Sequence, residues 1–124
     1  MNKEVQMWLR RAKSSLVLSK TPKDNDIFYE DLCFDAQQSA EKSLKALIIH
    51  QGLKPPKTHS FRVLINEIKK RMTLPETVLD VLDLDDYAIF TRYPGDYRPI
   101  DDDEYHDAVR IAEYIYNWVV DNTK

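Results

Sequence analysis

Basic and aromatic side chains gather in two parts of the chain, in a pattern typical of phosphate binding. Lys42 and Lys45 are three residues apart, so on a helix both fall on one side within a single turn. The segment 92–99 carries two arginines and two tyrosines, and guanidinium groups bind phosphate through charge-assisted hydrogen bonds. We expect the cations to line a cleft with the tyrosines at its mouth. The candidate nucleotide-binding residues are Lys42, Lys45, His59, Arg92, Tyr93, Tyr97 and Arg98.

Each of these residues also has a purely structural interpretation. Arg92 could pair with Glu41 and fasten its loop, and His59 could order the turn before the next helix. The two lysines could simply be solvated. Gln37, Gln38 and Glu41 form a polar stripe beside those lysines. If that stripe is buried, it must be hydrogen-bonded, either to the loop of Arg92 or across a dimer.

The aspartate clusters do not predict a metal site. Asp83, Asp85 and Asp86 are followed later by a second run at 101–103, but neither run has a further ligand at suitable spacing. Consecutive carboxylates at a helix start point in different directions and do not converge on one ion. Gly95 has no phosphate-cradling motif around it, which excludes a P-loop. We therefore expect no metal and no cofactor.

Bulk composition favours one small helical domain spanning residues 1–124. Only two glycines occur among the 124 residues, too few for the tight turns of a sheet protein. The single cysteine, Cys33, cannot form an intrachain disulfide, which fits a reducing compartment. No apolar stretch approaches the roughly 20 residues of a membrane span, and the first residues do not form a secretory signal. These features predict a soluble, cytoplasmic protein.

The charges are segregated along the chain, although the formal net charge is only −3. Basic side chains outnumber acidic ones six to two in residues 1–24 and eight to one in residues 42–71. In residues 76–124 the acidic side chains lead by thirteen to four. This asymmetry indicates either an electropositive face for phosphates or basic helices packed beside acidic ones.

The spacing of apolar residues predicts an all-α, up-and-down bundle of four to five helices. Apolar residues recur every three or four positions over residues 3–19, which is one face of an amphipathic helix. A second and longer stripe runs over residues 28–48, where Gly52 marks the end of the helix. We expect this second helix to be central.

Shorter helices are expected in the middle of the chain. One covers residues 61–68, and another begins at Pro75, which is tolerated as a first helical residue, and continues into Leu84. Residues 87–92 could extend it. The segment 92–99 contains two prolines and a glycine and therefore cannot be the interior of a helix.

The last helix is expected to run from just after Asp101 to about Asn122. Asp101 and Glu104 form a variant of the capping box, and the acidic first turn suits the positive end of the helix dipole. This helix is apolar over more than one face, and surplus apolar surface on a small bundle favours a homodimer. The residues beside its main apolar stripe are Ile111, Tyr114 and Trp118.

Three motifs in a fixed order resemble the HEPN family. The first is YEDLCFDAQQSAEKSLKAL at residues 29–47, the second is THS at 58–60, and the third is RYP at 92–94. Trp8, the Ala12 that follows it and the long closing helix extend the similarity over nearly the whole chain. The type it resembles is the prokaryotic, stand-alone domain that bears the RYP motif.

The resemblance implies a bundle of four or five helices that is usually dimeric. In bacteria and archaea such domains are often encoded beside a minimal nucleotidyltransferase, and some form toxin and antitoxin pairs. In the ribonuclease branch, an arginine and a histidine four to six residues apart meet at the dimer cleft and cleave RNA without metal. The guanidinium would neutralise the scissile phosphate, and the imidazole would move the proton of the 2′-hydroxyl.

The spacing of that ribonuclease motif is absent here. After four, five or six intervening residues, Arg92 is followed by Tyr97, Arg98 and Pro99. His106 comes seven intervening residues after Arg98. A phenol, with a pKa of about 10, is a poor general base at neutral pH. The family mechanism is therefore not predicted, and the remaining catalytic candidates are Arg92, Arg98 and His106.

Three functional hypotheses follow. The leading one is a dimeric HEPN-type domain that binds a nucleotide or RNA phosphate and acts with a minimal nucleotidyltransferase, in a toxin–antitoxin pair. The second is a metal-independent endoribonuclease that uses Arg92 or Arg98 with His106. The third is a non-catalytic module whose loop and polar stripe only set the geometry of a dimer.

Overall fold

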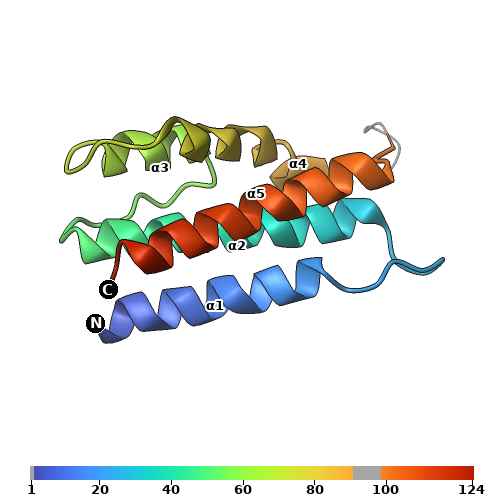
Figure 1. The fold of residues 1–124 in the computed structure, drawn as a ribbon, viewed down its shortest axis with the longest axis horizontal. Helices are drawn as coiled ribbons and strands as arrows, with labels where there is room; N and C mark the ends of the chain where they lie inside the picture. The colour runs from blue at the N-terminus through green and yellow to red at the C-terminus, as the bar shows by residue number, and fades with distance from the viewer. Residues whose placement is uncertain (1, 91–98) are drawn as a thin grey trace.

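The computed structural model describes residues 2–90 and 99–124, and throughout these residues the chain forms helices and loops without strands. This confirms the all-α bundle (Figure 1). The elements are α1 (Lys3–Ser19), α2 (Tyr29–His50), α3 (Phe61–Ile68), the 3₁₀ helix η1 (Glu76–Leu84), α4 (Tyr87–Phe90) and α5 (Asp102–Asp121).

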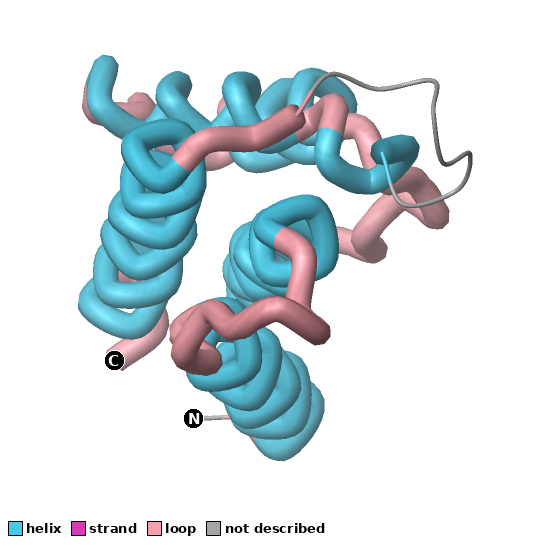
Figure 2. The backbone as a smooth tube through the Cα atoms, turned by 90° about the vertical axis from the view of Figure 1, so that its right-hand side faces the viewer, coloured by secondary structure: helices cyan, strands magenta, loops and turns pink. Residues whose placement is uncertain are grey.

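Helix α2 is the centre of the bundle. It packs against α1, against α5, and against the upper layer made by α3, η1 and α4. Seen along the helices, α1 and α5 lie beside α2 while the short elements cross above (Figure 2). The two termini lie at the same end of the molecule (Figure 1). The prediction that the second helix is central is thus confirmed.

Helix α1 begins and ends where its sequence predicts. The side chain of Asn2 caps it by accepting from the backbone N–H of Glu4 at 2.6 Å, which satisfies one of the orphan donors of the first turn. Its buried face contains Ala12, where α2 approaches closely. The Ser39 hydroxyl donates to the Ala12 carbonyl oxygen at 2.8 Å. Small side chains at this contact let the two backbones come near each other.

Helix α2 ends at a left-handed glycine, as predicted. Gly52 has a φ of 82°, a conformation that side-chain-bearing residues rarely adopt. The Gly52 N–H donates to the Ile49 carbonyl, and the Leu53 N–H reaches back to the Ile48 carbonyl. Both bonds satisfy carbonyls that the end of the helix leaves without partners, a role typical of C-terminal glycines.

Segment Glu76–Leu84 forms a 3₁₀ helix instead of the expected α-helix. Its buried residues are Val78, Val81 and Leu84, spaced by three, which lie on one face when three residues make a turn. The α-helical interpretation relied on Leu79, which is exposed instead. Pro75, predicted as the first helical residue, is instead the N-cap with extended backbone, so the element begins one position later, at Glu76.

Helix α5 keeps half of its predicted capping box. Asp101 accepts from the backbone N–H of Glu104 at 2.8 Å. The Glu104 carboxylate instead accepts from the Tyr87 hydroxyl at 2.6 Å, which ties α4 to the first turn of α5. At the same end, the Tyr105 hydroxyl donates to the Ser19 carbonyl and closes α5 onto the end of α1.

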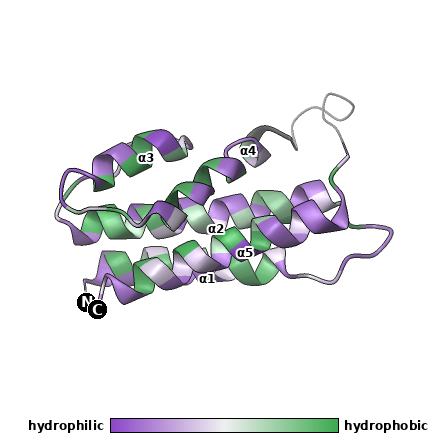
Figure 3. Ribbon diagram, turned by 45° about the horizontal axis from the view of Figure 1, so that its top comes forward, coloured by the Kyte–Doolittle hydropathy of each residue, from purple (hydrophilic) through white to green (hydrophobic). Residues whose placement is uncertain are grey.

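The apolar sides of the helices meet in one continuous core, and hydrophilic residues follow the outside of each helix (Figure 3). Leu44, Phe61 and Ile115 are fully buried within it. Truncating a buried leucine such as Leu44 to alanine costs about 2–5 kcal/mol. Among the described helices, none has both the length and the apolar character required to cross a membrane.

Candidate functional site

The polar stripe of α2 is buried, and it centres on Glu41. This carboxylate is only 5% exposed. Its Oε1 lies 2.8 Å from Nδ1 of His59 and accepts from Nε2 of Gln37 at 3.1 Å, while its Oε2 accepts from Nζ of Lys45 at 3.1 Å. Gln38 in turn donates to Gln37 at 2.8 Å. Hydrogen bonds therefore satisfy the stripe, as its burial demands.

Two local features assemble this cluster. Gln37, Glu41 and Lys45 are four residues apart on α2, so their side chains stack along one side of the helix. His59 arrives from the loop between α2 and α3, whose end is fixed where Ser60 caps α3 through Val63. The N–H of Phe61, the first residue of α3, donates to Asp85 at 3.0 Å. This bond ties the start of α3 to the end of η1.

His59 combines an anchored nitrogen with an exposed ring. Its side chain is 63% exposed even though Nδ1 contacts the buried carboxylate. An ionised Glu41 can only accept, so Nδ1 carries the hydrogen and Nε2 is the nitrogen left for other partners. The turn-ordering and ligand-facing roles considered for His59 therefore belong to different nitrogens of one ring.

The two candidate lysines have different partners. Lys45 is 12% exposed, pairs with Glu41, and places Nζ 5.8 Å from the ring centroid of Trp8. Lys42 instead turns toward α1, where Nζ donates to the Ser15 hydroxyl at 2.9 Å. Burial lowers the pKa of Lys42, and the neighbouring charge of Arg11 lowers it further.

The model of the HEPN domain family matches residues 5–123, nearly the whole chain. The chain belongs to the HEPN family. It is similar to ST0689, an archaeal HEPN homologue, with a TM-score of 0.79, 28% identity and 100% coverage of both chains. It is also similar to TT1696 from Thermus thermophilus, with a TM-score of 0.69, 29% identity, and 96% of this chain and 92% of that one covered. No curated protein matches.

The third motif of this HEPN domain falls outside the residues that the structure describes. Arg92, Tyr93, Tyr97 and Arg98 all lie in the segment 91–98. The expected pairing of Arg92 with Glu41 lies outside them as well. Within the described residues, His59, Lys45 and Gln37 supply hydrogen bonds to this carboxylate.

His106 lies apart from the Glu41 cluster. It sits in the second turn of α5, where Nε2 is 3.3 Å from Oδ1 of Asp102 and the side chain is 68% exposed. Its ring tilts against Tyr105, with 5.1 Å between the centroids. Neither of these described neighbours is an arginine, the partner that the ribonuclease mechanism requires.

A second buried acid, Glu30, lies near the start of α2. Glu30 is buried and accepts from the Ile100 N–H at 3.4 Å. Nearby, burial together with the charges of Glu104 and Glu30 raises the pKa of the Cys33 thiol to about 12. Cys33 is thus an unreactive core residue at neutral pH, as expected from its position on the apolar side of α2.

Helix α1 contributes residues that the motifs did not indicate. Arg11 and Ser15 are four residues apart and so share the side of α1 that meets Lys42. In the sequence, only the excess of basic residues in 1–24 pointed to this part of α1. That excess does not distinguish a solvated charge from one that faces another cation. Within the described part of the HEPN domain, no group of three or more potential metal ligands occurs.

Proposed function

We propose that this HEPN domain, as a single unit over residues 1–124, dimerises and binds the phosphate of a nucleotide or RNA. We further propose that it acts with a minimal nucleotidyltransferase in a toxin–antitoxin pair inside the cell. The observation that carries the binding proposal is the exposed edge of His59. A buried carboxylate orients this ring, and orientation by a second residue is how binding sites are preorganised.

Basic side chains on α1 and α2 support a phosphate as the ligand. Lys42 follows Glu41 in α2 and contacts Ser15 of α1. The charge of Arg11, also on α1, lies close enough to lower the pKa of Lys42. Arg92 and Arg98 would add guanidinium groups from the loop of the RYP motif. The tyrosines of that loop, Tyr93 and Tyr97, would close the mouth of the cleft.

Exposed apolar side chains support a dimer. Val17 and Leu18 at the end of α1 are 58% and 53% exposed, and Phe28 at the start of α2 is 64% exposed. These three side chains flank the loop that joins α1 to α2, where they are available to contact a second copy of the chain. Light scattering during size-exclusion chromatography measures the mass directly, and a monomer at micromolar concentration would contradict this part of the proposal.

Binding is tested by fluorescence anisotropy with labelled ATP and with a short labelled single-stranded RNA. His59→Asn keeps a donor for Glu41 at the position of Nδ1 but removes Nε2, whereas His106→Asn is the matched control. We expect His59→Asn to weaken binding about tenfold, the value of one charge-assisted hydrogen bond, and the control to leave it unchanged. Equal affinities for both variants would contradict a ligand role of His59.

The partner is tested separately. We expect the adjacent gene to encode a minimal nucleotidyltransferase, and co-expression of the two proteins followed by affinity purification of either should recover both. If only the protein that carries the affinity tag is recovered, the proposed partnership is wrong. Phosphate binding would still be decided by the anisotropy measurement. The endoribonuclease alternative, with Arg92 or Arg98 and His106, requires RNA cleavage in EDTA that Arg92→Ala abolishes.

A further inference from the structure

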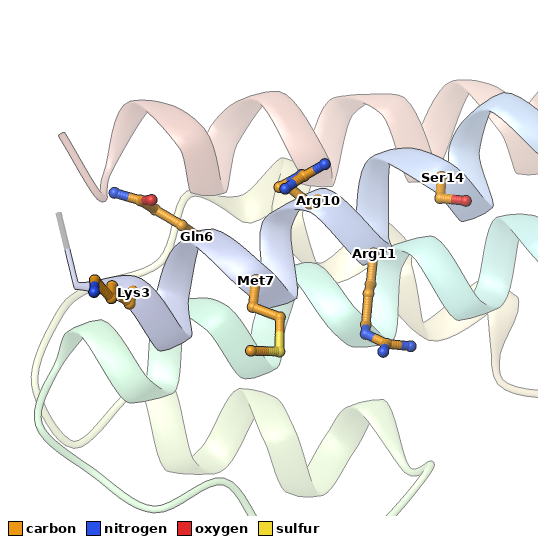
Figure 4. A pocket seen from close by; sticks show the side chains of 6 residues that line it. All are labelled: Lys3, Gln6, Met7, Arg10, Arg11 and Ser14. Carbon is orange, nitrogen blue, oxygen red and sulfur yellow. The ribbon is translucent and has the colours of Figure 1, made fainter.

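The outer side of α1 forms an open basic cavity. Its volume is about 570 Å³, and all the lining side chains come from α1 and are exposed. Met7 and Arg11 point to the side of α1 where α2 lies, and Gln6 and Arg10 point toward α5 (Figure 4). The lining residues are Lys3, Gln6, Met7, Arg10, Arg11 and Ser14.

At the edge of this cavity, Arg11 and Lys42 are like charges held near each other. Neither forms an ion pair with another described residue, and the Lys42 ammonium donates only to the Ser15 hydroxyl. The charges of Glu41 and Asp35 partly offset this repulsion by raising the pKa of Lys42, but neither carboxylate forms an ion pair with it. Repulsion between the two cations is unfavourable, and an anion bound to both would relieve it.

We propose that Arg11 and Lys42, the latter held by Ser15, form a subsite for one backbone phosphate of a single-stranded RNA that runs along the exposed basic side of α1. Arg11 offers a planar fork of donors and Lys42 a point charge, while the buried Ser15 hydroxyl positions the Lys42 ammonium. The inference rests on the proposed phosphate binding and specifies the class of ligand.

The shape of the surface favours an extended polyanion over a free nucleotide. Small ligands are bound in concave pockets that bury most of their surface, whereas every side chain lining this cavity is exposed. Basic residues extend along α1 from Lys3 to Arg11, a distance of about 12 Å at 1.5 Å per residue. Single-stranded nucleic acids are bound by basic surfaces that follow their backbone.

An aromatic ring lies next to the subsite. Trp8 precedes Arg11 by one turn of α1 and is partly exposed, with Lys45 placed over its ring. Proteins that bind single strands combine cations with aromatic rings on which bases stack. A base adjacent to the bound phosphate would therefore contact the exposed part of Trp8, and Lys45 would connect this surface to the Glu41 cluster.

The test measures RNA affinity by anisotropy as the salt concentration is raised from about 50 to 200 mM. We expect Arg11→Gln and Lys42→Gln each to weaken binding about tenfold at the lower salt and to reduce the salt slope by about 0.7. The matched controls are Arg71→Gln and Lys69→Gln, which remove the same charges beyond the end of α3. Thermal unfolding by circular dichroism verifies that all four variants are folded.

Different results overturn different statements. If RNA binds but the α1 and α2 variants behave like the controls, the subsite is wrong while the proposed function stands. If ATP binds as tightly as RNA and competes with it at Arg11, the extended ligand is wrong. Equal competition by poly-glutamate would show a general polyanion surface and overturn recognition of a nucleic acid. Absence of binding to ATP and RNA would contradict both the subsite and the proposed function.

Discussion

Oε1 of Glu41 and Nδ1 of His59 lie 2.8 Å apart, although 18 residues separate them in the chain. The carboxylate belongs to the central helix, and the imidazole belongs to the loop that leads to α3. Their contact joins the two layers of the bundle and fixes the orientation of an exposed ring. A single buried acid thus controls both the packing of the loop and the direction of the free nitrogen.

Removing the charge of Glu41 should destabilise the fold. Glu41→Gln keeps the size of the side chain but leaves the poorly exposed Lys45 ammonium without its counter-ion. We expect a loss of about 2–3 kcal/mol in the free energy of unfolding, typical of hydrogen bonds to charged groups. Urea unfolding followed by circular dichroism at pH 7 measures it.

Glu67→Gln provides the control for this change. Glu67 pairs with Lys70, whose side chain is 60% exposed, on the outside of the upper layer. Exposed pairs contribute about 0–1 kcal/mol, so this variant should unfold close to the native midpoint. If both variants lose a similar free energy of unfolding, burial does not strengthen the contribution of the Glu41–Lys45 pair.

The two nitrogens of His59 should be separable in stability measurements. His59→Asn retains a donor for Glu41 and should change the free energy of unfolding by less than about 0.5 kcal/mol. His59→Ala removes this donor and should cost about 1–2 kcal/mol. If the two substitutions reduce stability equally, the amide does not replace Nδ1, and the separation of roles is wrong.

The sequence predicted the long helices well because local signals agreed there. In α1 and α5 the apolar spacing, the caps at Asn2 and Asp101 and the flanking loops all indicate the same bounds. In η1 the signals conflict, since the buried residues repeat every three positions while neighbouring leucines complete an α-helical pattern. Packing against α2 and α5 decided between the two periods, and sequence spacing alone does not contain that information.

The candidate site was harder to predict than the fold. The polar stripe on α2 required partners, but the sequence did not identify His59 and Lys45 as those partners. Lys42 and Lys45 share a helical turn, yet small differences in direction give them Ser15 and Glu41 as partners. Arg11 resembles any solvated charge until the tertiary structure places Lys42 beside it.

The N-cap of α5 should contribute measurably to stability. Asp101→Ala removes the acceptor for the N–H of Glu104, and loss of such a cap costs about 1 kcal/mol. Asp103→Ala removes a carboxylate of the same first turn that does not cap the helix, and about 0.3–0.5 kcal/mol is expected from the dipole alone. Urea unfolding compares the two, and a larger cost at Asp103 would contradict the assignment of the cap.

The buried thiol of Cys33 should make the fold less stable at alkaline pH. Its pKa is raised from 9.0 to about 12, so the unfolded chain loses this proton before the folded chain does. The contribution is fully present below about pH 9 and declines as the pH rises toward 12. Cys33→Ala lacks this proton and should cost about 1 kcal/mol at pH 7 through the cavity it leaves.

The comparison between native protein and Cys33→Ala isolates the thiol, because every other titrating group is common to both. Urea unfolding at about pH 7.5, 9 and 10.5 should show the native advantage shrinking as the pH rises. A constant difference across this range would mean that the unfolded and folded thiols titrate together.

Reversing the charge of Arg11 should move stability and RNA binding in opposite directions. Arg11→Glu places a carboxylate beside Lys42, replaces repulsion by attraction, and preserves helix propensity. We expect a gain of up to about 1 kcal/mol in the free energy of unfolding, as for a surface ion pair, together with loss of RNA affinity. Urea unfolding and anisotropy measure the two effects on the same preparation.

The pH dependence gives this variant a second signature. The lowered pKa of Lys42 means that the unfolded chain binds this proton more tightly, so native stability rises as the pH increases from that lowered pKa toward 10.5. In Arg11→Glu the pKa returns toward its ordinary value, and this rise should flatten. Arg10→Glu makes the same change in net charge on the side of α1 that faces α5 (Figure 4). Because Arg10 does not lower the pKa of Lys42, an equal gain in stability from Arg10→Glu would show that overall charge, and not the contact between Arg11 and Lys42, is responsible.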